Sequence, residues 1–204
     1  MATTYRSAFV VYRELLRAFP NLRNNRDWCL RSPLNDSYQC VAWAVCRADR
    51  KWWPLNSLYY YWLPGLPRVT PVFGATLFTP VDYITRGLAR LGFESCGHSS
   101  DFEFGYQKVA VYATYVAGAT HVARQSMWGR SWLSKLGELE DIRHKSLTAV
   151  GGDTAYGDVV QILKRSWITA ARNNFCFRYL MTYARISAQY MKWMVLELKR
   201  KTSF

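Results

Sequence analysis

Cys40 has the local sequence that places a thiol at the start of a helix. The polar, turn-prone segment 35–39 leads directly into the small apolar run 41–44. Unpaired backbone N–H groups and the positive end of the helix dipole at such a position favour the thiolate. Because the thiolate is the nucleophilic form of cysteine, the sequence predicts a nucleophile at Cys40.

A histidine that could take the thiol proton follows about 80 residues later. His121 lies in the strand-like stretch 120–124, with the sequence Thr-His-Val-Ala-Arg. An imidazole beside a thiol can accept its proton and later protonate a leaving group, which permits a covalent acyl intermediate. A helix-start cysteine followed by a strand histidine is the order of papain-like enzymes, so we expect a cysteine hydrolase.

The remaining cysteines and histidines lack such a setting. Cys46 falls deeper in the same predicted helix and is expected in the core, and His98 is expected in a surface loop. Five scattered cysteines without a CxxC pair favour neither a disulfide framework nor a zinc site. We expect no metal and no cofactor, and a reducing cytosol as the compartment.

The elements that must position these residues follow a helix-then-strand order. Helical spacing predicts helices over 4–19, from Cys40 to about Asp49, and over 79–92. The aromatic stretch 52–65 is predicted to be a loop over the core or, alternatively, a wall beside a substrate groove. Alternation predicts strands over 108–113, 120–125, 131–135 and 156–163, the first three as an antiparallel meander. This order indicates an α+β fold.

The C-terminal segment is strongly basic. The chain has a net charge of +13, and residues 164–204 contain nine basic residues and one acidic residue. We predict a hydrolase-like domain over 1–164 and a basic amphipathic helix over 165–204. That helix is either a solvated face packed on the domain or a contact for nucleic acid, an anionic membrane or an acidic protein. Its candidate partner-binding residues are Arg165, Arg172, Arg178, Arg185, Lys192 and Lys199.

Five motifs together resemble a known family. They are Tyr38-Gln39-Cys40-Val41-Ala42-Trp43-Ala44, Thr120-His121-Val122-Ala123-Arg124-Gln125, Trp132-Leu133-Ser134-Lys135-Leu136-Gly137, Glu140-Asp141-Ile142-Arg143-His144 and Tyr156-Gly157-Asp158-Val159-Val160. Over roughly residues 18–164 the chain is similar to a mainly bacterial domain family of unknown function that resembles NlpC-type papain-like cysteine peptidases and amidases. The resemblance implies a helix-borne Cys packed against an antiparallel sheet whose strand presents the His.

The resemblance also implies a third residue that orients the imidazole. In NlpC-like enzymes it comes from the strand after the His, which here falls near 133–135, on no His, Asn or acid. Asp141 is therefore the first candidate and His144 the second, whereas Glu138 and Glu140 are expected to be solvated. An oxyanion could be held by the Cys40 N–H with Asn35 or Gln39.

The predicted function is a papain-like thiol hydrolase, either a peptidase or amidase, or an acyl transferase, with a peptide or amide substrate. The motif Gln39-Cys40-Val41-Ala42 departs from the Asp-Cys-Ser-Gly of NlpC enzymes, so hydrolysis of cell-wall peptides does not carry over. No signal peptide and no uncharged apolar run of 18 residues is found. We expect a cytoplasmic enzyme or an effector toxin secreted without a signal peptide. The alternative is a non-catalytic binding module that engages an anionic partner through its basic helix.

Overall fold

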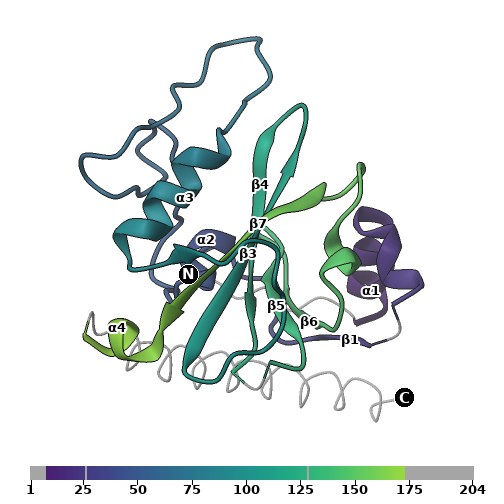
Figure 1. The fold of residues 1–204 in the computed structure, drawn as a ribbon. Helices are drawn as coiled ribbons and strands as arrows, with labels where there is room; N and C mark the ends of the chain where they lie inside the picture. The colour runs from purple at the N-terminus through teal and green to yellow at the C-terminus, as the bar shows by residue number, and fades with distance from the viewer. Residues whose placement is uncertain (1–7, 26, 128, 173–204) are drawn as a thin grey trace.

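A computed structural model of the chain describes residues 8–25, 27–127 and 129–172. They form one antiparallel sheet in the order β1-β6-β5-β4-β3-β7-β2, with α1 on one side and α2 and α3 on the other (Figure 1). The expected α+β class and the antiparallel meander are confirmed, because β3, β4, β5 and β6 are consecutive neighbours.

Seven strands make up the sheet. The four predicted strands correspond to β3, β4, β5 and β7, whereas the short strands β1, β2 and β6 were not predicted. The bounds are β1 Trp28–Leu30, β2 Glu94–Ser95, β3 Tyr106–Thr114, β4 Gly118–Gln125, β5 Trp132–Lys135, β6 Asp141–His144 and β7 Asp158–Ser166.

The helices confirm two predictions and correct a third. The predicted first and third helices are present, but the Cys40 helix ends at Ala44 and not near Asp49. Cys46 has a φ of 66°, and the N–H of Arg47 donates to the carbonyl of Ala42 at 2.7 Å, which closes the helix as a Schellman motif. The helical elements are α1 Ala8–Ala18, η1 Pro20–Arg23, α2 Cys40–Ala44, α3 Val81–Arg90, η2 Leu147–Val150 and α4 Trp167–Arg172.

The sheet separates two hydrophobic cores. Val111 and Val122 face α2 and α3, and the alternate residues Tyr112 and Ala123 face α1 and η2. Successive side chains in a strand point to opposite faces, so the central strands β3, β4 and β7 contribute to both cores. We call the first side the α2 face and the second the α1 face.

The ladder between β4 and β5 is short. β3 and β4 pair from Val109↔Arg124 to Thr114↔Gly118, whereas β4 and β5 pair only at Arg124↔Leu133 and Gln125↔Trp132. The next β5 residues, Ser134 and Lys135, pair with β6 on their other side. The two strands therefore part beyond Leu133, and we call this place the β4–β5 opening.

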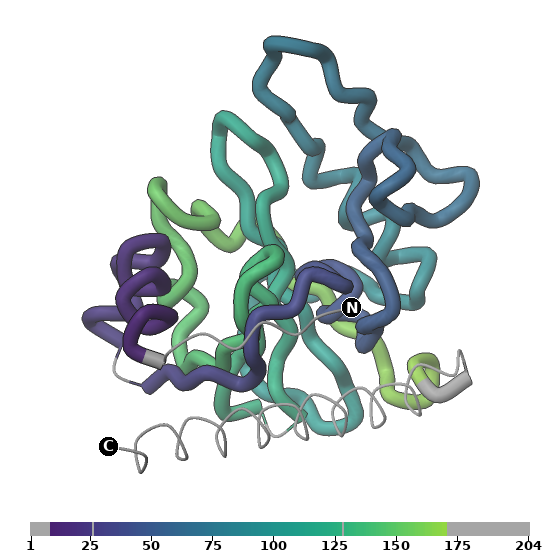
Figure 2. Tube along the Cα trace, turned by 180° about the vertical axis from the view of Figure 1, so that it is seen from behind, coloured from purple at the N-terminus to yellow at the C-terminus, as the bar shows by residue number. Residues whose placement is uncertain are grey.

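The aromatic stretch 52–65 is a loop, as predicted, and part of it covers the core. Trp52 and Trp62 are buried, and Trp62 packs on α3 at Gly87, where an added Cβ would lie 2.4 Å from the indole. The chain then extends away from the sheet before it returns to α3 (Figure 2). In the part of the chain that the structure describes, no helix is long and apolar enough to cross a membrane.

Candidate active site

Cys40 is the first residue of α2, and its sulfur is buried against the sheet. Gln39, immediately before it, has an extended backbone with φ −128° and ψ −179°. Cys40 is only 4% exposed, and the backbone N–H of Val122 hydrogen-bonds its sulfur. Burial raises the pKa of the thiol to about 11, more than that N–H lowers it. The resting form is therefore the neutral thiol, because a helix of five residues does not offset the cost of burying a charge.

His121 lies in β4, on the α1 face. It is fully buried, its Nε2 lies 2.9 Å from the Oγ of Ser134, and its ring stacks on Tyr156 with the centroids 4.1 Å apart. Burial, and secondly the neighbouring His144, hold the pKa of His121 well below its usual value. Nδ1 is buried and has no hydrogen-bond partner among the described residues.

A hydrogen-bonded chain fixes the tautomer of His121. The Nδ1 of His144 lies 2.7 Å from the carbonyl of Ser146, which can only accept, so Nδ1 carries the proton and Nε2 is bare. Ser134 lies 2.8 Å from that Nε2 and must donate to it. Ser134 therefore accepts from the Nε2–H of His121, and the buried Nδ1 of His121 is left with a free lone pair. This is the protonation state that a general base requires.

Ser134 is the hydrogen-bond partner of the His121 imidazole, and His144 lies behind Ser134. Ser134 falls in the segment 133–135 to which the family resemblance pointed, but its hydroxyl is not one of the predicted candidates, Asp141 and His144. His144 reaches His121 only through Ser134. The ring of Tyr156, the first residue of the fifth motif, lies flat on the imidazole, a contact that the sequence did not predict.

Asp141 faces the other side of the sheet and does not contact His121. Its Oδ2 accepts from the hydroxyl of Tyr38 at 2.9 Å, and it pairs in the ladder with Lys135. Both side chains are buried, and the ammonium of Lys135 also donates to the carbonyl of Leu139. Burial raises the pKa of Asp141 and lowers that of Lys135, and each opposes the shift of the other. Asp141 thus belongs to a buried polar network beside Cys40.

The other predicted residues near the site have ordinary roles. The Oδ1 of Asn35 accepts from the backbone N–H of Ser37 at 2.9 Å, which makes a local turn. Gln39 precedes α2 and makes no side-chain capping hydrogen bond. Glu138 is exposed as predicted, but Glu140 is buried, so the prediction that it is solvated was wrong.

Cys40 lies on the opposite face of the sheet from His121, against Val122, the next residue of β4. The cross-strand pairs Tyr112↔His121 and Val111↔Val122 put the imidazole on the α1 face and Val122, with Cys40, on the α2 face. The Cys40 sulfur takes the N–H of Val122, whereas the side-chain hydrogen bond from His121 to Ser134 spans the β4–β5 opening. Within the described residues no hydrogen bond joins the thiol to the imidazole, since Nδ1 has no partner.

The first of the predicted partner-binding residues, Arg165, is not on a basic surface. Arg165 lies in β7, is 1% exposed and donates to the Oε1 of Gln107 at 2.8 Å, so it offers no surface for an anion. Arg172 is the last residue of α4. The remaining four, Arg178, Arg185, Lys192 and Lys199, lie outside the described residues. Among the residues that are described, no group of three or more His, Cys, Asp or Glu side chains is placed to hold a metal ion.

The buried histidines predict that acid destabilises the fold. Burial lowers the pKa of His144 from 6.5 to about 4, so between these values the unfolded chain binds a proton that the native state does not. The contribution of His144 to the free energy of unfolding is therefore fully present above pH 6.5. It falls as the pH drops, by about 3 kcal/mol at pH 4. Urea denaturation across this range measures the slope, which His144→Asn should reduce. A stability independent of pH from 6.5 to 4 would contradict the burial of a neutral imidazole.

Comparison with known proteins identifies a family without a known activity. A family model described as a domain of unknown function, DUF7689, matches residues 29–164, so the chain belongs to this family. Neither a curated protein nor a solved structure matches the chain. The match covers α2 and all the strands that carry the site residues.

Proposed function

We propose that this member of the DUF7689 family is a thiol hydrolase with a papain-like arrangement, in which Cys40 is the nucleophile and His121 the base. The observation that carries the proposal is the free lone pair on the buried Nδ1 of His121. An unpaired buried polar atom costs about 1–3 kcal/mol, and such groups call for a functional explanation. Here Ser134, His144 and the Ser146 carbonyl together hold that nitrogen ready to accept a proton.

The proposed reaction begins from neutral groups. Nδ1 of His121 takes the thiol proton as the Cys40 sulfur attacks the substrate carbonyl, and the imidazolium then protonates the leaving amine or thiol. The product is a thioester on Cys40. Water, deprotonated by the same nitrogen, attacks that thioester and releases the acid and the thiol. An amine in place of water would give acyl transfer, and the N–H of Cys40 is the proposed donor to the oxyanion.

Access to the thiol requires the β4–β5 opening to widen. Cys40 is 4% exposed in the resting structure, so a substrate cannot reach the sulfur unless β5 moves relative to β4. Two ladder pairs and the side-chain hydrogen bond from His121 to Ser134 join these strands, fewer backbone pairs than at either other junction of the meander. The same movement brings solvent to Cys40 and lowers the burial cost that keeps its thiol neutral.

The order of the elements supports the papain-like arrangement. A short helix that starts at the proposed nucleophile precedes the antiparallel strands, and it packs on β4 and β5. The proposed base and the residue that orients it come from these two adjacent strands, His121 from β4 and Ser134 from β5. This matches the strand order that the resemblance implied, with a hydroxyl in place of the usual orienting group.

An activated ester tests the proposal directly. Mixing the protein with p-nitrophenyl acetate should release a burst of nitrophenol equal to the protein present and leave one acetyl group on Cys40, located by peptide mass spectrometry. Cys40→Ala should abolish both. Cys96→Ala removes a half-buried thiol elsewhere and should change neither. Acetylation spread over several residues, or a burst that survives Cys40→Ala, would refute the proposal.

The burial of Cys40 favours a second candidate, a non-catalytic binding module. A thiol that is 4% exposed with a pKa of about 11 is also what a structural core cysteine would show. In that case the excess positive charge of +13 would serve an anionic partner. The absence of any burst with the wild-type protein, together with binding to a polyanion that weakens as salt rises, would support this candidate.

A further inference from the structure

Two segments far apart in the sequence present exposed apolar side chains at one end of the molecule. One is the loop before α3 and the other is the turn of the β3–β4 hairpin (Figure 1). Phe73 and Tyr115 are at full exposure, 106% and 100%. The set, which we call the apolar tip, consists of Val72, Phe73, Leu77 and Phe78 of the loop and Tyr115 and Val116 of the hairpin.

Backbone hydrogen bonds join the two segments. The N–H of Thr79 donates to the carbonyl of Ala117 at 2.8 Å, and the N–H of Ala119 donates to the carbonyl of Thr79 at 2.7 Å. Gly118 has a φ of +67°, and a Cβ there would lie 2.1 Å from the Thr79 carbonyl oxygen, so only glycine permits this approach. The loop and the hairpin therefore form one surface.

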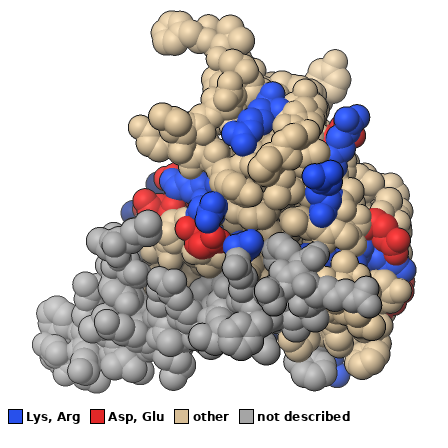
Figure 3. All heavy atoms as spheres, turned by 90° about the vertical axis from the view of Figure 1, so that its left-hand side faces the viewer, with Lys and Arg blue, Asp and Glu red and all other residues tan. Residues whose placement is uncertain are grey.

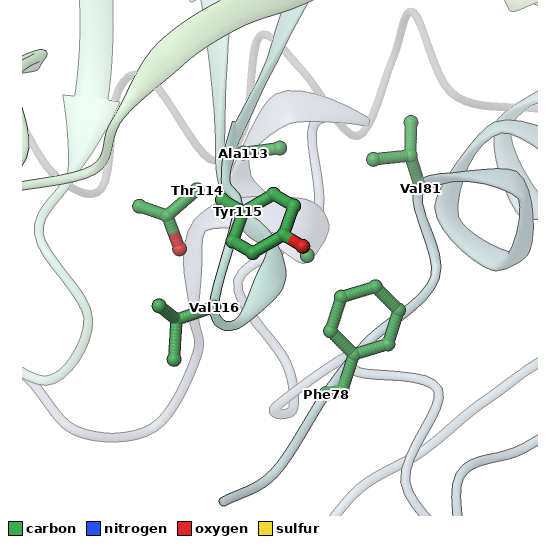
Figure 4. A pocket seen from close by; sticks show the side chains of 7 residues that line it. Phe78, Val81, Ala113, Thr114, Tyr115 and Val116 are labelled. Carbon is green, nitrogen blue, oxygen red and sulfur yellow. The ribbon is translucent and has the colours of Figure 1, made fainter.

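An open hollow of about 640 Å³ lies between them. Phe78 and Val81 line one side, and Tyr115 and Val116 line the other (Figure 4). Large exposed apolar patches on a soluble surface indicate an interaction site, whereas single exposed apolar residues do not. The apolar tip brings six exposed apolar side chains together and therefore indicates an interaction site.

Charge points to the partner. Arg68 is the only charged residue from Trp52 to Val81, and residues 109–123 contain no Lys, Arg, Asp or Glu. In Figure 3 the uppermost part of the molecule shows neither blue nor red atoms, and Lys and Arg side chains lie below it together with some Asp and Glu. An apolar tip without acidic residues on a chain of charge +13 is complementary to an anionic lipid surface.

We infer that the apolar tip inserts into the interface of an anionic membrane. The fully exposed side chains of Phe73 and Tyr115 protrude, and a fluid bilayer accommodates protruding side chains that a rigid protein surface would need matching pockets to receive. Aromatic residues are also suited to the interface, because the ring enters the apolar layer while the tyrosine hydroxyl stays hydrated. This inference does not depend on the catalytic proposal.

Sedimentation with lipid vesicles tests the inference on the full chain. The wild type should bind vesicles of phosphatidylcholine mixed with phosphatidylserine more tightly than vesicles of phosphatidylcholine alone. This difference in affinity should shrink as the salt concentration rises. The double variant Phe73→Ser, Tyr115→Ser should lower the partition coefficient about tenfold or more. Phe104→Ser is the matched control, since Phe104 is 79% exposed but precedes β3, at the opposite end of that strand from Tyr115. It should bind as the wild type does.

Three outcomes would overturn the inference. The first is a wild type that binds neither vesicle. The second is a double variant that binds as tightly as the wild type, because the contact would then lie elsewhere. The third is self-association in sedimentation velocity that the double variant abolishes, without vesicle binding, which would make a second copy of the chain the partner. Both substituted side chains are solvent-exposed, so the double variant should fold normally.

Discussion

His121→Asn is expected to slow the acetylation of Cys40 about 10²- to 10⁴-fold, which is the usual contribution of a general base. The amide of Asn has no lone pair basic enough to take the thiol proton, although it can keep a hydrogen bond to Ser134. Without the base, the reaction must wait for the free thiolate, which is scarce because the pKa of Cys40 is about 11. The burst rate of the variant should therefore rise with pH up to about that value, whereas that of the wild type should not.

Ser134 provides the internal control for this prediction. Ser134→Ala breaks the chain from His121 to His144 and lets the imidazole change tautomer, so it should cause a smaller loss than His121→Asn. Ser134→Thr keeps the hydroxyl and should recover much of the rate. Equal burst rates in the wild type and His121→Asn at neutral pH would show that the histidine has no part in the chemistry.

Lys135→Ala is expected to lower the free energy of unfolding by about 3–5 kcal/mol at neutral pH. The side chain is fully buried, and it lies beside the buried carboxyl group of Asp141, one oxygen of which has no hydrogen-bond partner within the described residues. Removing the ammonium takes away the main compensating charge of that carboxyl group, since Arg124 opposes the cost of its burial more weakly. It also exposes a cavity under the ring of Tyr38, which lies 5.2 Å from the ammonium.

Two variants separate this effect from a general loss of packing. In Lys135→Met, Asp141→Asn both charges are removed at similar volume, so most of the stability should return. Lys145→Ala removes a largely exposed ammonium from an ion pair of 3.3 Å with Asp27 and should change stability by less than about 1 kcal/mol. Urea denaturation at constant salt measures all three. Equal stabilities for Lys135→Ala and Lys145→Ala would mean that the buried pair is not energetically coupled.

Much of the fold could be predicted from periodicity. The helices α1 and α3 and the strands β3, β4, β5 and β7 have apolar patterns strong enough to define them. The strands β1 and β2 have three and two residues, too few to show an alternation, and β6, with four, is missed as well. They are strands only because long-range pairing with β6, β7 and β5 completes the sheet.

The site was predicted in part. The helix start at Cys40 and the strand at His121 are local features, and both are present in the structure. The role of Ser134 depends on pairing between strands, which a local pattern does not contain. The neutral state of Cys40 depends on burial, and Arg165 was misplaced because β7 extends to Ser166. In each case tertiary packing outweighs the local sequence signal.

The short ladder at the β4–β5 opening divides the sheet mechanically. β3, β4 and β7 form one extensively paired unit and β1, β5 and β6 form another; the sheet ladder joins them by two residue pairs, beside the hydrogen bond from His121 to Ser134. The thiol and the imidazole sit beside the first unit, whereas Ser134 belongs to the second. A displacement between the units would therefore change solvent access to the Cys40 sulfur and the restraint on the His121 imidazole at the same moment.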